Sequence, residues 1–98
     1  VCVVTVSQPY AAIAFAETGN ERVQADILNE LNIVFPPRVD YKAGGDPHIS
    51  TARTKAALMV GSKEISIQDG KPQLAAGRSV YVVDFVGGET IEVNVHCI

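Results

Sequence analysis

The residues QLAAGRSVYVVDFVGGETIEVNVHCI, at positions 73–98, decide the fold. Two runs rich in β-branched and aromatic residues, 80–86 and 89–96, flank Gly87-Gly88. Such runs are typical of strands, and a glycine pair between them is typical of a tight turn. The stretch therefore predicts a β-hairpin that closes the chain.

The second of these runs ends at Cys97, and the only other cysteine, Cys2, lies in the opening run VCVVTV. An antiparallel pairing with Cys2 opposite Cys97 puts valine opposite valine on one face, namely Val4 with Val95 and Val6 with Val93. The other face is mostly polar, as a half-buried antiparallel pair requires. We therefore expect the first and last strands to be adjacent.

Directly opposed residues of antiparallel strands are close enough for a disulfide, so the same register predicts a bond between Cys2 and Cys97. Closing a loop of nearly the whole chain would stabilise the fold by on the order of 4 to 5 kcal/mol in the chain-entropy model. The alternative is a pair of free buried thiols in a cytosolic protein.

Length and composition bound the class of protein. We expect residues 1–98 to form a single domain, since 98 residues supply one core. The hydrophobic content of 47% excludes disorder. No apolar run is long enough to span a bilayer. A net charge of −3 without a cluster of lysine or arginine predicts no nucleic-acid partner.

The compartment is predicted from two features. The chain begins at Val1 rather than methionine, which fits a processed and exported form or a trimmed chain. A disulfide between its ends would also fit an oxidising environment. We therefore expect a secreted, extracellular protein.

One helix is clear from the spacing of apolar residues. Between positions 20 and 31 they fall on one face of a helix, at Val23, Ile27, Leu28 and Leu31. Asn20 is a candidate N-cap, as is Thr18 with Glu21 at capping-box spacing. The preceding residues 8–18 fit either a helix, which their alanines favour, or a strand in which Ile13 and Phe15 alternate with alanines.

The middle of the chain alternates between loop and strand patterns. Residues 38–42 fit a short strand, and residues 43–54, AGGDPHISTART, predict the longest loop. Residues 56–60 and 64–68 then predict two strands, followed by a turn at 69–72. Successive strands joined by tight turns indicate an antiparallel meander. The fold class is therefore α+β, an antiparallel sheet with adjacent terminal strands and one main helix packed on it.

The strand at 80–86 is apolar on both faces. A two-residue turn at Gly87-Gly88 would bury Asp84, whereas a three-residue turn directs Asp84 toward Thr90 and Glu92, and we favour the latter. In either register both faces must be covered, by the helix and a second layer within the monomer or by another chain. We expect coverage within the monomer.

Motifs for chemistry are few. The sequence contains no glycine-rich phosphate loop, CxxC pair, HExxH helix or GxSxG elbow. A metal site would need His48 and His96 to converge with acids, for which Asp40, Asp46 and Asp84 are the candidates. We expect no metal and no cofactor, and we interpret Asp84 as a hydrogen-bonded strand residue rather than a catalytic acid.

Two short stretches resemble known families. Gln73-Leu74-Ala75-Ala76-Gly77 resembles the QxVxG loop of cystatins, which implies a protease inhibitor that inserts this loop into a cleft; Ala75 stands where the motif has valine, and the cystatin tryptophan is absent. Residues 60–82 resemble the repeating strand unit of copper amine oxidase N-terminal-like domains, which are secreted modules without copper chemistry. Each match covers about a quarter of the chain, and neither identifies the family. Both imply an exported β-rich binding module.

The resulting hypothesis is a secreted, non-enzymatic module, inhibitor-like or effector-like, that binds another protein. It would bind through Gln73, Leu74, Ala75, Ala76 and Gly77, or through the loop that carries Gly45, Asp46 and His48. An alternative is a structural subunit of an extracellular oligomer or filament that binds copies of itself through sheet edges. A third, less favoured, is a small hydrolase built around Asp84 and a histidine.

Overall fold

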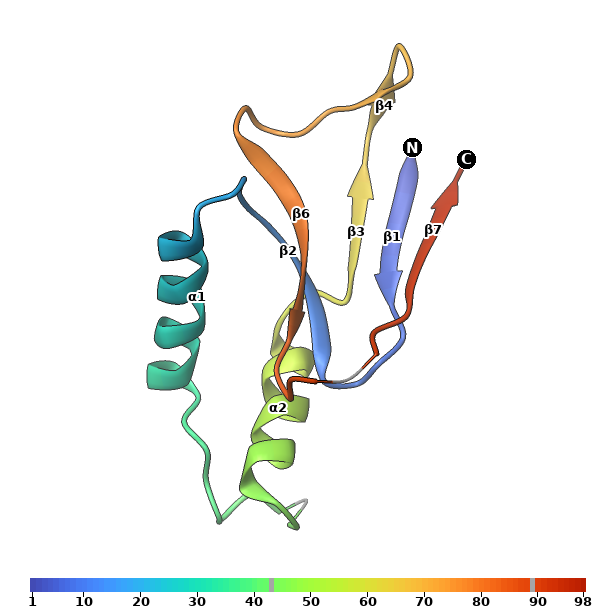
Figure 1. The fold of residues 1–98 in the computed structure, drawn as a ribbon. Coiled ribbons are helices and arrows are strands. Elements are labelled where there is room, and N and C mark those ends of the chain that lie inside the picture. Colours follow the sequence, from blue (N-terminus) through green and yellow to red (C-terminus); the bar gives the residue numbers. More distant parts are fainter. Residues whose placement is uncertain (43, 89) are drawn as a thin grey trace.

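The computed structural model describes residues 1–42, 44–88 and 90–98. Its elements, in chain order, are β1 (Cys2–Val6), β2 (Ala11–Glu17), α1 (Glu21–Val34), α2 (Pro47–Leu58), β3 (Ser62–Ile65), β4 (Ile67–Gln68), β5 (Lys71–Pro72), β6 (Arg78–Asp84) and β7 (Val93–Cys97). A three-stranded sheet has the order β3-β1-β7, and two further pairs are β2-β6 and β4-β5, all antiparallel (Figure 1). The predicted α+β class is confirmed. The predicted ranges 43–54 and 89–96 each begin at a residue, Ala43 or Glu89, outside the described residues.

The pairing of the terminal strands is the predicted one, residue for residue. Cys2 lies opposite Cys97, and the pairs Val4 with Val95 and Val6 with Val93 follow in register. The Cα atoms of the two cysteines are 4.0 Å apart, and their sulfur atoms form a disulfide. No helix among the described residues has the length and apolar character needed to cross a bilayer.

The predicted closing hairpin is wrong, and with it the meander. β6 pairs with β2 along its whole length, from Ala11 opposite Asp84 to Glu17 opposite Arg78, while β7 pairs with β1. Asp84 ends β6 because its Oδ1 accepts hydrogen bonds from the backbone N–H groups of Val86 and Gly87, each at 3.0 Å. The register that placed Asp84 opposite Thr90 and Glu92 therefore does not occur.

The Gln8 side chain holds the crossing from β6 to β7. Its Nε2 donates to the carbonyl oxygen of Thr90 at 3.2 Å, and its Oε1 accepts from the backbone N–H of Glu92 at 3.1 Å. One amide thus satisfies a donor and an acceptor of a segment more than eighty residues away. These bonds fix the segment that precedes β7, which then pairs with β1.

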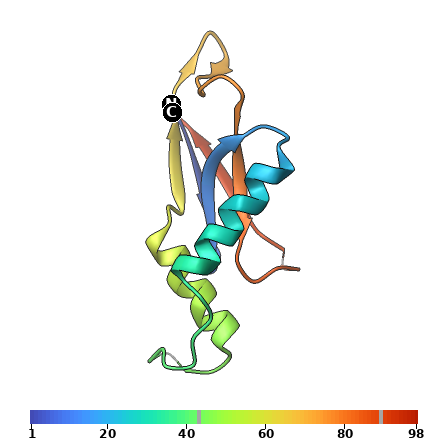
Figure 2. The ribbon, with the colours of Figure 1, turned by 90° about the vertical axis from the view of Figure 1, so that its left-hand side faces the viewer.

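Residues 8–18, for which the sequence fits either a helix or a strand, contain the strand β2. Ala11, Ala12 and Ile13 are buried on both faces, because the β3-β1-β7 sheet covers one side of the β2-β6 pair and the helices cover the other (Figures 1 and 2). Ile13 packs with Val4 of β1, whereas Ala12 packs with Ala52 of α2. Burial in two layers overrides the helix propensity of alanine. The expected coverage of β6 within the monomer is only partial, because no residue of β6 is buried and Val82 is 39% exposed.

Helix α1 begins where expected but lies away from the sheet. Asn20 is its N-cap, accepting from the backbone N–H groups of Arg22 and Val23. It runs to Val34, three residues beyond the expected end, and none of its residues is buried. Its apolar side is therefore only partly covered by β2 and β6, which leaves space between them.

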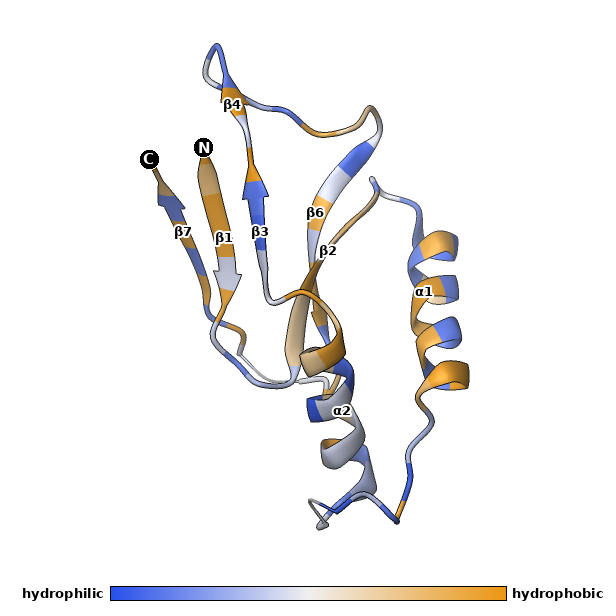
Figure 3. Ribbon diagram, turned by 180° about the vertical axis from the view of Figure 1, so that it is seen from behind, coloured by the Kyte–Doolittle hydropathy of each residue, from blue (hydrophilic) through white to orange (hydrophobic). Residues whose placement is uncertain are grey.

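A second helix, α2, takes in residues 47–54 of the predicted loop and residues 56–58 of the predicted strand, so both predictions are wrong there. Asp46 caps it through a 2.9 Å bond from the backbone N–H of His48, and Pro47 occupies its first turn. Its buried side is formed mainly by small residues such as Ala52 and Ala56, so it carries no continuous hydrophobic stripe (Figure 3). The other predicted strands also change: 38–42 is not a strand, and 64–68 divides between β3 and β4.

Candidate functional site

The two loops predicted to bind a partner lie at opposite ends of the molecule (Figure 1). Gln73–Gly77 follows β5, next to the tip of the β4-β5 pair, whereas Gly45, Asp46 and His48 lie at the start of α2. The structure therefore does not bring them into one surface.

The loop at 73–77 is tied to the strands beside it. The Gln73 backbone N–H donates to the carbonyl oxygen of Ser66 at 2.8 Å, and Leu74 packs against the core that contains Val4. The Gly77 carbonyl accepts from the Thr18 backbone N–H at 2.7 Å. Gly77 has a φ of +75°, a backbone conformation that glycine adopts without strain. Ala75 and Ala76 are exposed between these contacts.

Polar side chains converge instead in a cavity of about 150 Å³ between α1, α2 and the end of β6. Helix α2 contributes His48, Thr51 and Lys55, whose spacing of three and four residues places them on one face of the helix. The opposite wall comes from Leu31 and Asn32 of α1, and Asp84 closes the side toward β6. Residues 47–58, folded as α2, thus supply the polar wall of the site.

Lys55 is the buried cation of this cavity. Its residue is 6% exposed, and its Nζ donates to the Oδ1 of Asn32 at 2.5 Å and lies 5.9 Å from the centre of the Phe85 ring. No carboxylate of the described residues forms an ion pair with it. Burial lowers the pKa of Lys55, because removing water disfavours the charged form.

Thr51 adds an unpaired hydroxyl to the same face. It is 2% exposed, and its Oγ1 has no hydrogen-bond partner among the described residues. A buried hydroxyl without a partner costs about 1 to 3 kcal/mol. Such a group marks a position where a further acceptor or donor would be favourable.

His48 and Asp84 form the edge of the cavity toward the chain after β6. The His48 Nε2 lies 3.2 Å from the carbonyl oxygen of Val86, and because a carbonyl only accepts, this ring nitrogen donates. Asp84 is occupied by the backbone N–H groups described above. No three of the described histidines, cysteines and acids are arranged to hold a metal ion.

Comparison with known proteins gives the family. A model of the family described as UPF0047 protein YjbQ-like matches residues 1–98. The chain belongs to the YjbQ family. A YjbQ-family protein of Clostridium acetobutylicum, described as uncharacterized and conserved, is 35% identical and superposes with a TM-score of 0.86, covering 99% of this chain and 74% of that one.

Two further similar proteins come from archaea. A YbjQ-like protein of unknown function from Sulfolobus solfataricus shares the fold with a TM-score of 0.83 at 19% identity, covering 96% of this chain and 67% of that one. A UPF0047 protein of Methanocaldococcus jannaschii is 29% identical over 90 residues, or 89% of this chain. The chain spans 62% of the length of that curated relative.

Membership of the YjbQ family corrects the functional hypothesis. The predictions of a secreted, extracellular protein, of an inhibitor or effector and of a self-assembling subunit are wrong, because the relatives are conserved bacterial and archaeal proteins described without any such role. The cysteine pair does not by itself decide the compartment, since disulfides are not confined to secreted proteins. The resemblance to cystatins was based on only five residues, 73–77.

Sequence reasoning missed Thr51 because residues 43–54 were interpreted as a loop, and it missed Lys55 because this residue lies between that loop and the strand predicted at 56–60. The signal that could have found them is Asp46-Pro47, an N-cap followed by a proline in the first turn. A helix begun there places His48, Thr51 and Lys55 on one face.

Proposed function

We propose that the protein binds a small carboxylate in the cavity formed by α1, α2 and the end of β6. The observation that carries the proposal is an excess of buried hydrogen-bond donors. A protonated Lys55 offers three N–H groups and gives one to Asn32, and the Thr51 hydroxyl has no partner among the described residues. The group that completes these contacts is an acceptor with a negative charge.

Charge favours a carboxylate over a phosphate. The cavity has one buried cation, Lys55, and the carboxylate of Asp84 lies on its wall. A singly charged ligand balances Lys55, whereas a phosphate dianion would add a second negative charge beside Asp84. The ligand would also restore the solvation that Lys55 loses on burial.

We propose binding without turnover, by residues 1–98 acting as one domain. In support, the Thr51 hydroxyl makes no hydrogen bond to a base among the described residues, and an unactivated hydroxyl is a poor nucleophile. The net charge of −3 argues against a nucleic-acid partner. A small molecule thus takes the place of the protein partner that the sequence predicted.

Isothermal titration with acetate and with inorganic phosphate tests the proposal. Lys55→Met should weaken acetate binding more than tenfold. Thr51→Val, which removes only the hydroxyl, should weaken it about tenfold. The control is Lys71→Met, because Lys71 is exposed on β5. Equal binding by the wild type and Lys55→Met would overturn the site, tighter binding of phosphate would overturn the ligand class, and chemical change of the bound acid would overturn binding without turnover.

A further inference from the structure

A second cavity adjoins the carboxylate site. It has a volume of about 160 Å³ and lies where α1 stands away from the β2-β6 pair. Leu28 and Asp84 line both cavities, so the two are neighbours along α1. A ligand bound in one cavity can therefore extend into the other.

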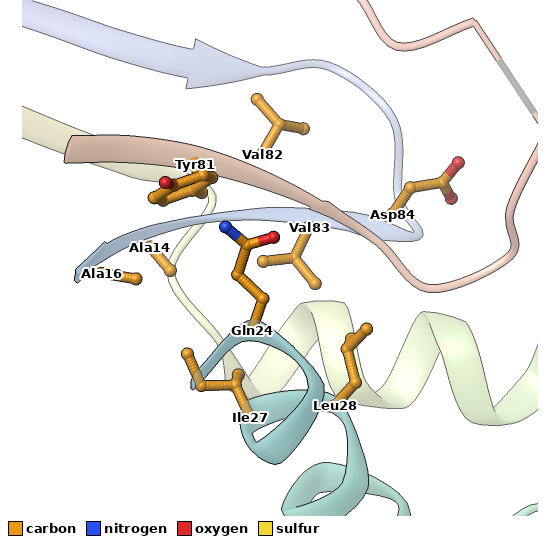
Figure 4. Close-up of a pocket in the computed structure, with 9 residues that line it drawn as sticks. All are labelled: Ala14, Ala16, Gln24, Ile27, Leu28, Tyr81, Val82, Val83 and Asp84. Carbon is orange, nitrogen blue, oxygen red and sulfur yellow. The ribbon is translucent and has the colours of Figure 1, made fainter. Parts of the chain in front are cut away.

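The walls of this second cavity are mainly apolar. Ile27 and Leu28 of α1 face Ala14, Tyr81 and Val83 of the strands, and Gln24 reaches between them (Figure 4). The carboxyl group of Asp84 points away from this cluster (Figure 4). A hydrocarbon group placed here would gain the usual free energy of apolar burial.

One of the two residues that line both cavities, Leu28, makes few contacts that fix its side chain. Leu28 is 45% exposed, although it belongs to the apolar side of α1. Its side chain can therefore change rotamer at little cost, and a ligand can cover it. Covering Leu28 would bury apolar surface that the chain by itself leaves in water.

We infer that the ligand is an amphipathic carboxylate whose head binds at Lys55 and Thr51 and whose hydrocarbon part fills the apolar cavity beside α1. The inference rests on the proposed function and names its ligand class. Two features commit the site to this occupant: Lys55 lines the first cavity only, and the apolar cavity shares Leu28 and Asp84 with the first one. A polar acid would leave the second cavity unused.

Titration with acetate, butyrate, hexanoate and octanoate tests the inference. The affinity should rise roughly fourfold for each methylene that is buried, and it should level off once the cavity is full. Ala14→Leu, which fills the apolar cavity, should remove this dependence on chain length. The matched control is Ala57→Leu on the exposed side of α2, which should keep it.

The outcomes separate the inference from the proposed function. If no carboxylate binds, the proposed function itself fails. If acetate binds and the longer acids bind no better, the carboxylate site stands and the amphipathic ligand is overturned. If hexanol binds as tightly as hexanoate, the apolar cavity acts without the head group and the joint site is also overturned. If hexanoate binds the wild type, and both Lys55→Met and Ala14→Leu weaken this binding, the result supports the joint site.

Discussion

Cys2 and Cys97 lie directly opposite each other on β1 and β7, and their disulfide joins positions 95 residues apart. A covalent link between the two ends removes much of the conformational entropy of the unfolded chain. We expect the double variant Cys2→Ser, Cys97→Ser to lose about 4 to 5 kcal/mol of unfolding free energy. Urea denaturation of the oxidised, reduced and doubly substituted proteins measures this, and equal stability of the first two forms would contradict it.

The sequence determines the β1-β7 pairing well, because two independent features agree there. The cysteines set a register, and the same register sorts Val4, Val6, Val93 and Val95 onto one face. Only one pairing satisfies both, so it could be predicted without the rest of the fold.

The partner of β6 was hidden by its neighbours in sequence. A run of strand residues followed closely by another predicts a hairpin, since short connections are common. The actual partner, β2, is rich in alanine and shows its strand character only in the alternation around Ile13 and Phe15. Burial between two layers favours the strand conformation of β2. The local sequence does not show this burial, because it arises only when the chain folds.

The candidate site was hidden for a related reason. Only two of the five buried residues of α2 are apolar, and these two, Ala52 and Ala56, give a weak hydrophobic signal. Without the helix, Thr51 and Lys55 have no common face, and no motif links them to Asn32 of α1. Only the arrangement of α1 and α2 brings these three side chains together.

The Gln8 amide gives a test of the crossing between β6 and β7. Gln8→Ala removes both of its hydrogen bonds, to Thr90 and to Glu92. We expect a loss of about 1 to 2 kcal/mol, since each bond contributes about 1 kcal/mol. Gln73→Ala, which loses one exposed bond to the carbonyl of Lys71, should cost less. Thermal and urea denaturation compare the two, and a larger loss at Gln73 would contradict the role of Gln8.

The contact between β2 and α2 depends on small residues. Ala52 is 1% exposed and packs with Ala12, so Ala52→Leu inserts three carbons into a closely packed layer. We expect a loss of about 1 to 3 kcal/mol. Ala57→Leu, on the exposed side of the same helix, should change the stability by less than about 0.5 kcal/mol. Similar losses for both variants would show that the side chain of Ala52 has room around it.

The Thr51 hydroxyl should lower the stability of the unliganded protein and strengthen carboxylate binding. Thr51→Val keeps the shape and a similar helix propensity but removes a hydroxyl that has no partner among the described residues. We expect the unliganded protein to gain about 1 kcal/mol while carboxylate binding weakens. Thr54→Val is the matched control, because the Thr54 Oγ1 donates to the carbonyl of Ser50 at 3.0 Å and its removal should cost stability. A loss of stability in Thr51→Val would indicate that the hydroxyl is satisfied.

Lys55 should make the stability depend on pH with a defined sign. Burial lowers the pKa of Lys55 below 10.5, so the native protein releases this proton at a lower pH than the unfolded chain. Below the folded pKa both states are protonated, and the native state carries the full cost of a buried cation. Between the folded pKa and 10.5 the unfolded chain binds more protons, so this contribution raises stability as pH rises.

Replacing Lys55 isolates that contribution, since all other groups cancel between the variant and the wild type. We expect Lys55→Met to be more stable at neutral pH by on the order of 1 kcal/mol, because Asn32 is exposed and can bind water instead. The advantage should shrink as the pH rises toward 10.5. Lys71→Met should show no such trend. Urea denaturation across this pH range measures the difference, and an advantage that stays constant or grows with pH would mean that Lys55 is not penalised by burial.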